Sequence, residues 1–182
     1  MKASIILSTY NRPQALLTVL EALKLQTIQD FEVCIADDGS TKDTQQIIEN
    51  FQQNSAFPIL HAWQDDRGFR AASARNNAVR ISSGDYLLFL DGDCIPRPNW
   101  IQQHLALSEK HAFVAGNRVL LDETLSHAIE THRIPFTDLF GLNVLRHKEH
   151  INRLIPLLKI PLGSMRKLKP TSWAKVRTCN LG

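Results

Sequence analysis

The sequence has little that would mark a membrane-spanning, disulfide-bonded or zinc-binding protein. No apolar run in its 182 residues approaches the roughly twenty residues that cross a bilayer, and the stretch after Lys2 is too short for a signal peptide. The three cysteines form no Cys-x-x-Cys pair, so we expect Cys34 and Cys179 to be buried, reduced thiols. The seven histidines include no His-x-x-x-His zinc pair. These absences favour a cytoplasmic protein, or one bound peripherally to the cytoplasmic face of a membrane.

Charge is unevenly distributed along the chain. Residues 1–110 carry 10 Lys or Arg against 13 Asp or Glu, whereas residues 111–182 carry 11 against 5. The excess is concentrated at 146–177, where basic residues are interleaved with leucine and isoleucine, a pattern typical of docking on an anionic membrane face. Three prolines break any long helix there, so a surface loop or a segment packed on a further part of the protein is an equal alternative. Nucleic acid is disfavoured, because Trp173 is the one aromatic residue in the stretch.

The first ninety residues read as alternating strands and helices. Short apolar runs predict strands at 4–8, 31–36, 57–63 and 84–90, and helical spacing predicts helices at 13–26, after Ser40 and at 71–81. Ser40 and Asp43 resemble a capping box for the second helix. Further strands are expected at 112–121 and 178–181. This order indicates an α/β protein with a mostly parallel central sheet and helices on both faces, and a content of 43% hydrophobic residues suffices for one core.

Three polar clusters follow predicted strands: Ser8 to Asn11, Asp37 to Ser40, and Asp91-Gly92-Asp93. Ligands of parallel α/β sheets bind at the carboxyl ends of the strands, so these clusters are expected to converge on one crevice. Two carboxylates separated by a glycine form a hard oxygen site that suits Mg²⁺ or Mn²⁺ and the phosphates it carries. An isolated acid-x-acid turn is more often a solvated turn, which makes the accompanying clusters essential to the interpretation.

Five motifs together resemble the family 2 glycosyltransferases. They are Ser8-Thr9-Tyr10-Asn11, Asp37-Asp38-Gly39-Ser40, Gly68-Phe69-Arg70-Ala71-Ala72, Ala74-Arg75-Asn76 and Leu90-Asp91-Gly92-Asp93. The resemblance covers about residues 3 to 120 and implies a Rossmann-like A-type glycosyltransferase fold. It implies a nucleotide-sugar-binding domain at 1–121, followed at 122–182 by a basic extension and the start of an incomplete acceptor-side region. The version at 68–76 is similar to bacterial enzymes of surface polysaccharide or lipopolysaccharide synthesis.

The resemblance also implies a role for each motif residue. Donor binding falls to Ser8, Tyr10, Asn11, Asp38, Arg70, Arg75 and Asp91, and metal binding to Asp93 and Asp91. Asp38 would accept a hydrogen bond from a uracil base, unless it or Asp37 caps the following helix. Tyr10 would pack on the base, or serve as a structural tyrosine. Arg70 and Arg75 would contact the diphosphate, with Arg70 the stronger candidate because an arginine on an exposed helical turn is commonly solvated.

The implied reaction is inverting transfer of a sugar from a nucleotide diphosphate, such as a UDP-sugar, to a glycan or lipid-linked acceptor. Its general base belongs to a later acidic motif of the family, and the only two adjacent acidic residues after Asp93 are Asp122-Glu123, which come too early to match. The catalytic base is therefore expected beyond Gly182, and this stretch alone is expected to bind the donor with little transfer. A binding-only remnant and a sugar nucleotidyltransferase are the alternatives, although the latter needs a glycine-rich loop that 8–13 lacks.

Overall fold

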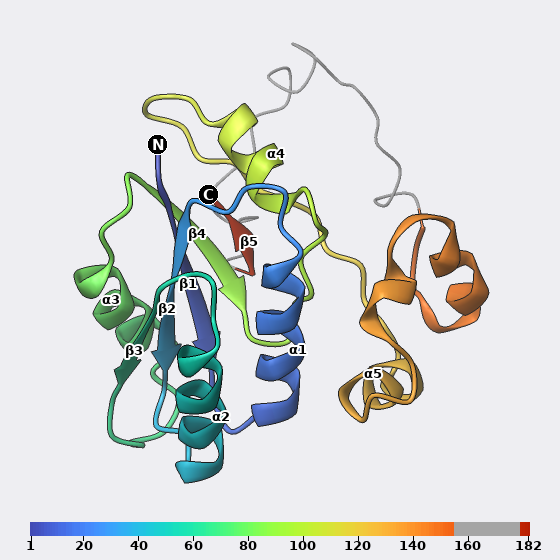
Figure 1. Cartoon of the computed structure of the whole chain (residues 1–182), viewed down its shortest axis with the longest axis horizontal. Helices are drawn as coiled ribbons and strands as arrows, with labels where there is room; N and C mark the ends of the chain where they lie inside the picture. The colour runs from blue at the N-terminus through green and yellow to red at the C-terminus, as the bar shows by residue number, and fades with distance from the viewer. Residues whose placement is uncertain (155–178) are drawn as a thin grey trace.

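A computed structural model of the chain describes residues 1–154 and 179–182. Its centre is a five-stranded sheet in the order β3-β2-β1-β4-β5 (Figure 1). The strands are β1 Ala3–Thr9, β2 Phe31–Asp37, β3 Ile59–Trp63, β4 Tyr86–Asp91 and β5 Asn180–Leu181. The first four are parallel, and β5 runs antiparallel to β4. The order reverses at β1, whose neighbours are β2 and β4, and this is the switch point at which such sheets open a crevice.

Helices cover both faces of the sheet, as expected. One face buries the inner sides of α1 Pro13–Lys24, α2 Lys42–Gln53 and α4 Trp100–Leu107 against alternate strand residues such as Ile5 and Val33. The other face packs α3 Ala71–Ile81 on Ile6 and Cys34, and the small Ala74 and Ala78 bring this helix close to the strands. Successive side chains of a strand point to opposite faces of the sheet, so one apolar run contributes to the core on both faces.

A second, smaller cluster follows the sheet. The elements are α5 Glu123–Glu130 and the 3₁₀ segments η1 Phe136–Leu139 and η2 Gly141–His150, which lie to one side of the sheet in Figure 1. Leu125, Ile129, Val144 and Ile151 form its core. The division into domains at 121/122 stays a prediction. Of the basic stretch 146–177, residues 155–177 lie outside the described residues. In the described part of the chain, no helix is long and apolar enough to cross a bilayer.

Two local predictions were wrong. The strand expected at 112–121 is reduced to isolated bridges: Ala115 pairs with Leu181 on the side of β5 away from β4, and Leu121 pairs with Ile151 in the second cluster. The capping box is not formed either: the N-cap of α2 is Thr41, without a side-chain hydrogen bond. Ser40 instead accepts a hydrogen bond from the Asn11 backbone N–H at 3.0 Å, which ties the loop after β2 to the loop after β1.

Candidate functional site

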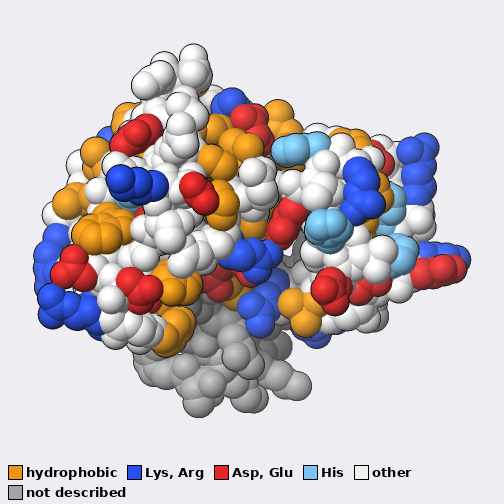
Figure 2. Space-filling model, turned by 90° about the horizontal axis from the view of Figure 1, so that it is seen from below, with side chains coloured by type: hydrophobic (Ala, Val, Ile, Leu, Met, Phe, Trp, Pro, Cys, Tyr) orange, Lys and Arg blue, Asp and Glu red, His pale blue; other side chains and the backbone are white. Residues whose placement is uncertain are grey.

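The three polar clusters do converge, on a cavity of about 310 Å³ at the carboxyl ends of β1, β2 and β4. Figure 2 views the molecule from this side and shows acidic and basic side chains around the hollow beside the α5–η2 part. We call this cavity the crevice. Its lining comprises Ser8, Thr9, Tyr10, Arg12, Ala36, Asp38, Phe69, Ala71, Arg75, Asp91, Gly92 and Asp93. Of the residues predicted to bind the donor, Asn11 and Arg70 are missing from that lining.

Arg75 joins the ends of β1 and β4. Its guanidinium donates to Asp91 Oδ1 at 2.7 Å and to Ser8 Oγ at 3.1 Å, and Ser8 Oγ donates to the same carboxylate oxygen at 3.1 Å. The Arg75 side chain is only 19% exposed, so it is not a solvated helix arginine. Its Nε is buried without a hydrogen-bond partner, as is Thr9 Oγ1 in the same lining. A buried donor without a partner calls for a ligand or an ordered water.

Gly92 brings the backbone of β4 against β1. Its N–H donates to the Ser8 carbonyl at 2.7 Å, and a Cβ at this position would lie 2.6 Å from that same oxygen. Any larger residue would push the two strand ends apart. The turn closes with the Cys94 N–H donating to the Asp91 carbonyl at 2.9 Å, and it presents Asp93 to solvent. The two carboxylates on this turn are the hard oxygen donors that Mg²⁺ and Mn²⁺ prefer.

Asp37 and Asp38 have different environments although they are adjacent. Asp37 is completely buried; its Oδ1 accepts from the Ser40 N–H at 2.8 Å and its Oδ2 lies 2.9 Å from His61 Nε2. Burial alone would raise the pKa of Asp37, but the hydrogen bonds from His61 and Ser40 hold it below the ordinary value. Asp37 therefore stabilises the turn after β2, which leaves Asp38 to face the crevice.

Asp38 organises the loop that precedes α3. Its Oδ1 accepts from Gln64 Nε2 at 2.6 Å and its Oδ2 accepts from the Arg70 backbone N–H at 2.7 Å. The guanidinium of Arg70 turns away and donates to the Asp65 carbonyl. The structure thus places Arg75, and not Arg70, in the crevice, whereas the sequence favoured the reverse order. Each carboxylate oxygen of Asp38 keeps a second lone pair for a further donor.

Aromatic side chains stand at the mouth of the crevice. Tyr10 is 48% exposed and its hydroxyl donates to Asp66 Oδ2 at 2.9 Å, a hydrogen bond that raises the pKa of Tyr10. Phe69, which the sequence interpretation did not single out, is 93% exposed although it lines the crevice. Asn11 has a structural role, because it adopts a left-handed conformation (φ 49°) and its Oδ1 accepts from the Thr41 N–H at 2.9 Å.

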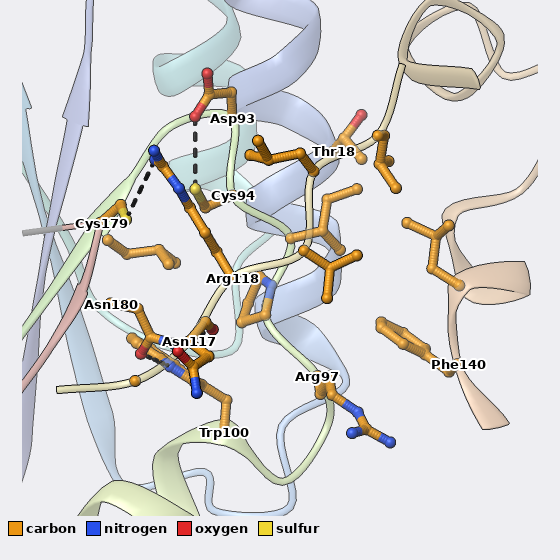
Figure 3. A pocket seen from close by; sticks show the side chains of 18 of the residues that line it. Thr18, Asp93, Cys94, Arg97, Trp100, Asn117, Arg118, Phe140, Cys179 and Asn180 are labelled. Carbon is orange, nitrogen blue, oxygen red and sulfur yellow. Dashed lines mark hydrogen bonds between the residues drawn. The ribbon is translucent and has the colours of Figure 1, made fainter. Parts of the chain in front are cut away.

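A larger cavity of about 700 Å³ adjoins the crevice, and Arg12 and Asp93 line both. Figure 3 shows its wall, to which α1, α4 and the segment after α4 contribute. Asn180 holds this wall together: its Oδ1 accepts from Trp100 Nε1 at 2.8 Å and lies 2.8 Å from His104 Nε2, and its Nδ2 donates to the Asn117 carbonyl. Burial lowers the pKa of His104, partly offset by Asn180. No local pattern in the sequence indicated these contacts.

Comparison with known proteins yields a consistent set of relatives. A family model described as glycosyl transferase family 2 matches residues 4–166. Validoxylamine A glucosyltransferase of Streptomyces hygroscopicus subsp. jinggangensis is 38% identical over 120 residues, which are 65% of this chain and 27% of that protein. Hyaluronan synthase of Pasteurella multocida is 36% identical over 122 residues, 65% of this chain and 12% of that protein. The chain thus spans only about a quarter or less of the length of these curated relatives.

Solved structures agree on the fold. S. aureus TarS 1–349 in complex with UDP-GlcNAc superposes with a TM-score of 0.51 at 28% identity, covering 66% of this chain and 34% of that chain. The mannosyltransferase PcManGT from Pyrobaculum calidifontis, in complex with GDP-Man and Mn²⁺, gives a TM-score of 0.55 at 20% identity, covering 64% of this chain and 35% of that one. At that identity the second similarity shows the fold alone. The sheet is thus the Rossmann-like A-type sheet of glycosyltransferases.

Proposed function

Because this chain belongs to glycosyl transferase family 2, we propose that its crevice binds a nucleotide-diphosphate sugar and that the protein transfers the sugar to a glycan or lipid-linked acceptor. A UDP-sugar is the donor we favour, since the structure of TarS, at 28% identity, holds UDP-GlcNAc. The hyaluronan synthase among the relatives supports polysaccharide synthesis as the setting. We propose that the polymer is a surface polysaccharide or lipopolysaccharide. The sugar transfer would take place in the cytoplasm or on the cytoplasmic face of a membrane.

The observation that carries the proposal is the state of Arg75. A guanidinium that is four-fifths buried, paired with Asp91 and left with an unbonded Nε suits an anionic ligand in the crevice. A diphosphate offers several oxygens to such a group, and arginine binds phosphate through more than one N–H at a time. Gly92 keeps the turn that bears Asp91 and Asp93 against the end of β1, because any Cβ there would meet the Ser8 carbonyl oxygen.

We place the base on the crevice side and the sugar on the larger-cavity side of the boundary that Arg12 and Asp93 share. On one side, Asp38 can accept from the imide N–H of uracil, and Tyr10 offers an aromatic ring beside it. On the other, the larger cavity begins at Asp93 and Arg12 and has room for the sugar and its acceptor. Asp91 and Asp93 are the residues that would hold Mn²⁺ or Mg²⁺. Such an ion, when bound, neutralises charge on the departing diphosphate.

The reaction we propose inverts the anomeric carbon, as the family resemblance implies. The residues described here supply donor recognition; we assign no general base among them. Inversion requires the acceptor hydroxyl to attack from the face opposite the diphosphate. The larger cavity, which shares Arg12 and Asp93 with the crevice, is where that hydroxyl would approach.

Calorimetry with UDP tests the donor site. We expect the unmodified chain to bind UDP more tightly with Mn²⁺ than with a chelator, and Asp93→Ala to abolish that difference. Asp30→Ala is the matched control, because Asp30 is an exposed carboxylate immediately before β2, at the opposite end of the sheet. Equal, metal-independent affinity in the unmodified chain and in Asp93→Ala would refute the metal assignment, and no UDP binding at all would refute the donor assignment.

A further inference from the structure

Two thiols meet beside the crevice although they are far apart in the sequence. Cys94 is fixed by the turn after β4, in which its N–H donates to the Asp91 carbonyl. Cys179 immediately precedes β5, and the pairing of Asn180 with Leu90 brings it to the same end of β4. One ligand atom from each of Asp91, Cys94 and Cys179 lies within 4.8 Å of the others. Among the residues that the structure describes, no other set of three histidine, cysteine or carboxylate side chains is grouped this closely.

This donor set differs in kind from the two carboxylates of the crevice. Thiolate sulfur selects borderline and soft cations, whereas Mg²⁺ and Mn²⁺ prefer oxygen alone. A Zn²⁺ site has Zn–S bonds of about 2.3 Å in a tetrahedron, which sets its sulfurs roughly 3.8 Å apart. Side-chain rotations that draw the three atoms together by about 1 Å would meet that requirement. Asp93 Oδ1 lies 3.6 Å from Cys94 Sγ and is close enough to become a fourth metal ligand.

The surroundings admit an ion. Both cysteines line the larger cavity, where Figure 3 shows their sulfurs close to Asp93 and Arg118. Cys179 is 4% exposed and Cys94 is half-buried, so the cluster is sheltered yet open on the cavity side. An Arg118 guanidinium N–H donates to Cys179 Sγ at 3.5 Å, so this sulfur already has a polar neighbour on the cavity side. Arg118 is an exposed side chain and can swing away when a cation arrives.

We propose that Cys94, Cys179 and Asp91 form a binding site for one divalent cation that binds thiolates, such as Zn²⁺. Each ion bound releases two thiol protons to solvent and forms two metal–sulfur bonds, with no change of oxidation state. The site shares Asp91 with Arg75, so its occupation draws that carboxylate from the crevice. One consequence, which rests on the proposed function, is that Zn²⁺ weakens UDP binding while Mg²⁺ does not.

The test uses the whole chain, fully reduced and free of nucleotide. Cd²⁺ is the probe, because its thiolate complexes absorb in the ultraviolet by sulfur-to-metal charge transfer, and Zn²⁺ should displace it. We expect saturation at one ion per chain. Cys94→Ala and Cys179→Ala should each remove most of the absorption, and Asp91→Asn should weaken binding by roughly tenfold or more. Cys34→Ala is the control, since Cys34 is completely buried in β2 and has no part in the cluster.

A sulfur-specific signal is necessary because exposed histidines such as His111, His127 and His132 offer Zn²⁺ alternative ligands. A second measurement needs no variant: alkylation of the unmodified chain followed by peptide mass spectrometry. Zn²⁺ should protect Cys94 and Cys179 together. Three results would each overturn the proposal. The first is that Cd²⁺ gives no charge-transfer band with the reduced chain, and the second is that the band survives loss of either cysteine. The third is that Zn²⁺ leaves the alkylation of both thiols unchanged. UDP binding with Mn²⁺ is also measured in the Cys94→Ala variant. If this variant binds UDP normally, the donor site is intact and a failure concerns the thiol site alone.

Discussion

Asp38 and Arg70 are joined through the backbone: the Arg70 N–H, and not its guanidinium, donates to Asp38 Oδ2 at 2.7 Å. The carboxylate therefore positions the loop before α3 while it faces the crevice. With Gln64 Nε2 on its other oxygen, Asp38 has a fixed orientation before any nucleotide arrives. A base contact made by such a preoriented group costs little further ordering.

The first prediction separates the two roles of Asp38. Asp38→Asn retains the shape but offers an N–H₂ in place of one acceptor, so we expect UDP binding to weaken by about 1–3 kcal/mol. Gln64→Ala is the control, because it loosens the same loop and leaves the carboxylate intact. Calorimetry should show that Asp38→Asn erodes the preference for UDP over CDP and GDP, and that Gln64→Ala affects all three alike. If Asp38→Asn lost affinity for UDP, CDP and GDP equally, Asp38 would only position the loop and would not recognise the base.

The second prediction concerns Arg75. Arg75→Gln removes the cation of the crevice, and loss of charge-assisted hydrogen bonds to phosphate should weaken UDP binding by about 1.5–3 kcal/mol. Uridine, which lacks the diphosphate, should bind both proteins equally. Arg80→Gln on the same helix is the control, since Arg80 is exposed and bonds to Asn77. If Arg75→Gln and Arg80→Gln bind UDP alike, Arg75 serves only to stabilise Asp91.

A third prediction concerns acid stability and arises at the opposite end of the sheet. Glu32 is 3% exposed and accepts hydrogen bonds from Ser4 Oγ at 2.6 Å, Lys2 Nζ at 2.9 Å and Ser83 Oγ at 2.7 Å. Burial raises the pKa of Glu32, but the hydrogen bonds from Ser4, Ser83 and Lys2 outweigh it and lower the pKa to about 2. The unfolded chain keeps a glutamate pKa of about 4.3, so the folded state holds the ionised form more strongly.

Its contribution to stability is therefore complete above pH of about 4.3 and is lost as the pH falls toward about 2. The shift corresponds to about 3 kcal/mol of unfolding free energy. Glu32→Gln should be less stable at pH 7 by about 1.5–3 kcal/mol, with the difference shrinking at low pH. Urea unfolding across this range measures it, with Glu21→Gln on the exposed side of α1 as control. A constant difference at all pH values would contradict the assignment.

Local patterns in the sequence were sufficient for the parts of the fold that depend on neighbours. The helix predicted at 71–81 has those bounds in the structure, because its apolar residues recur on one face and Ser82 ends it in an extended conformation. The convergence of Ser8, Asp38 and Asp91 was likewise predictable, since the carboxyl ends of parallel strands share one edge of the sheet.

Features that depend on distant contacts were not predictable. Sequence spacing placed Arg70 and Arg75 near the diphosphate, but it could not show that Asp65 draws the Arg70 guanidinium away. It gave no indication that Cys94 and Cys179 meet, because that contact arises from the antiparallel pairing of β5 with β4. The strand predicted at 112–121 was wrong for the same reason: a run of suitable residues does not reveal that its two ends have different partners, Leu181 in β5 and Ile151 in the second cluster.

The central position of β1 has a consequence for the order in which the molecule assembles. Ile5 pairs with Val33 in the next strand of the chain and with Leu88, which comes much later. Closing the longer loop costs more chain entropy, so we expect β1, β2 and β3 to associate before β4 docks. The nascent protein would then hold Tyr10 and Asp38 in place while the loop bearing Asp91 and Asp93 is still unpaired. Pulse-labelled hydrogen exchange during refolding should find the β2 amides protected earlier than those of β4. Simultaneous protection would mean that the two halves of the crevice form in the same step.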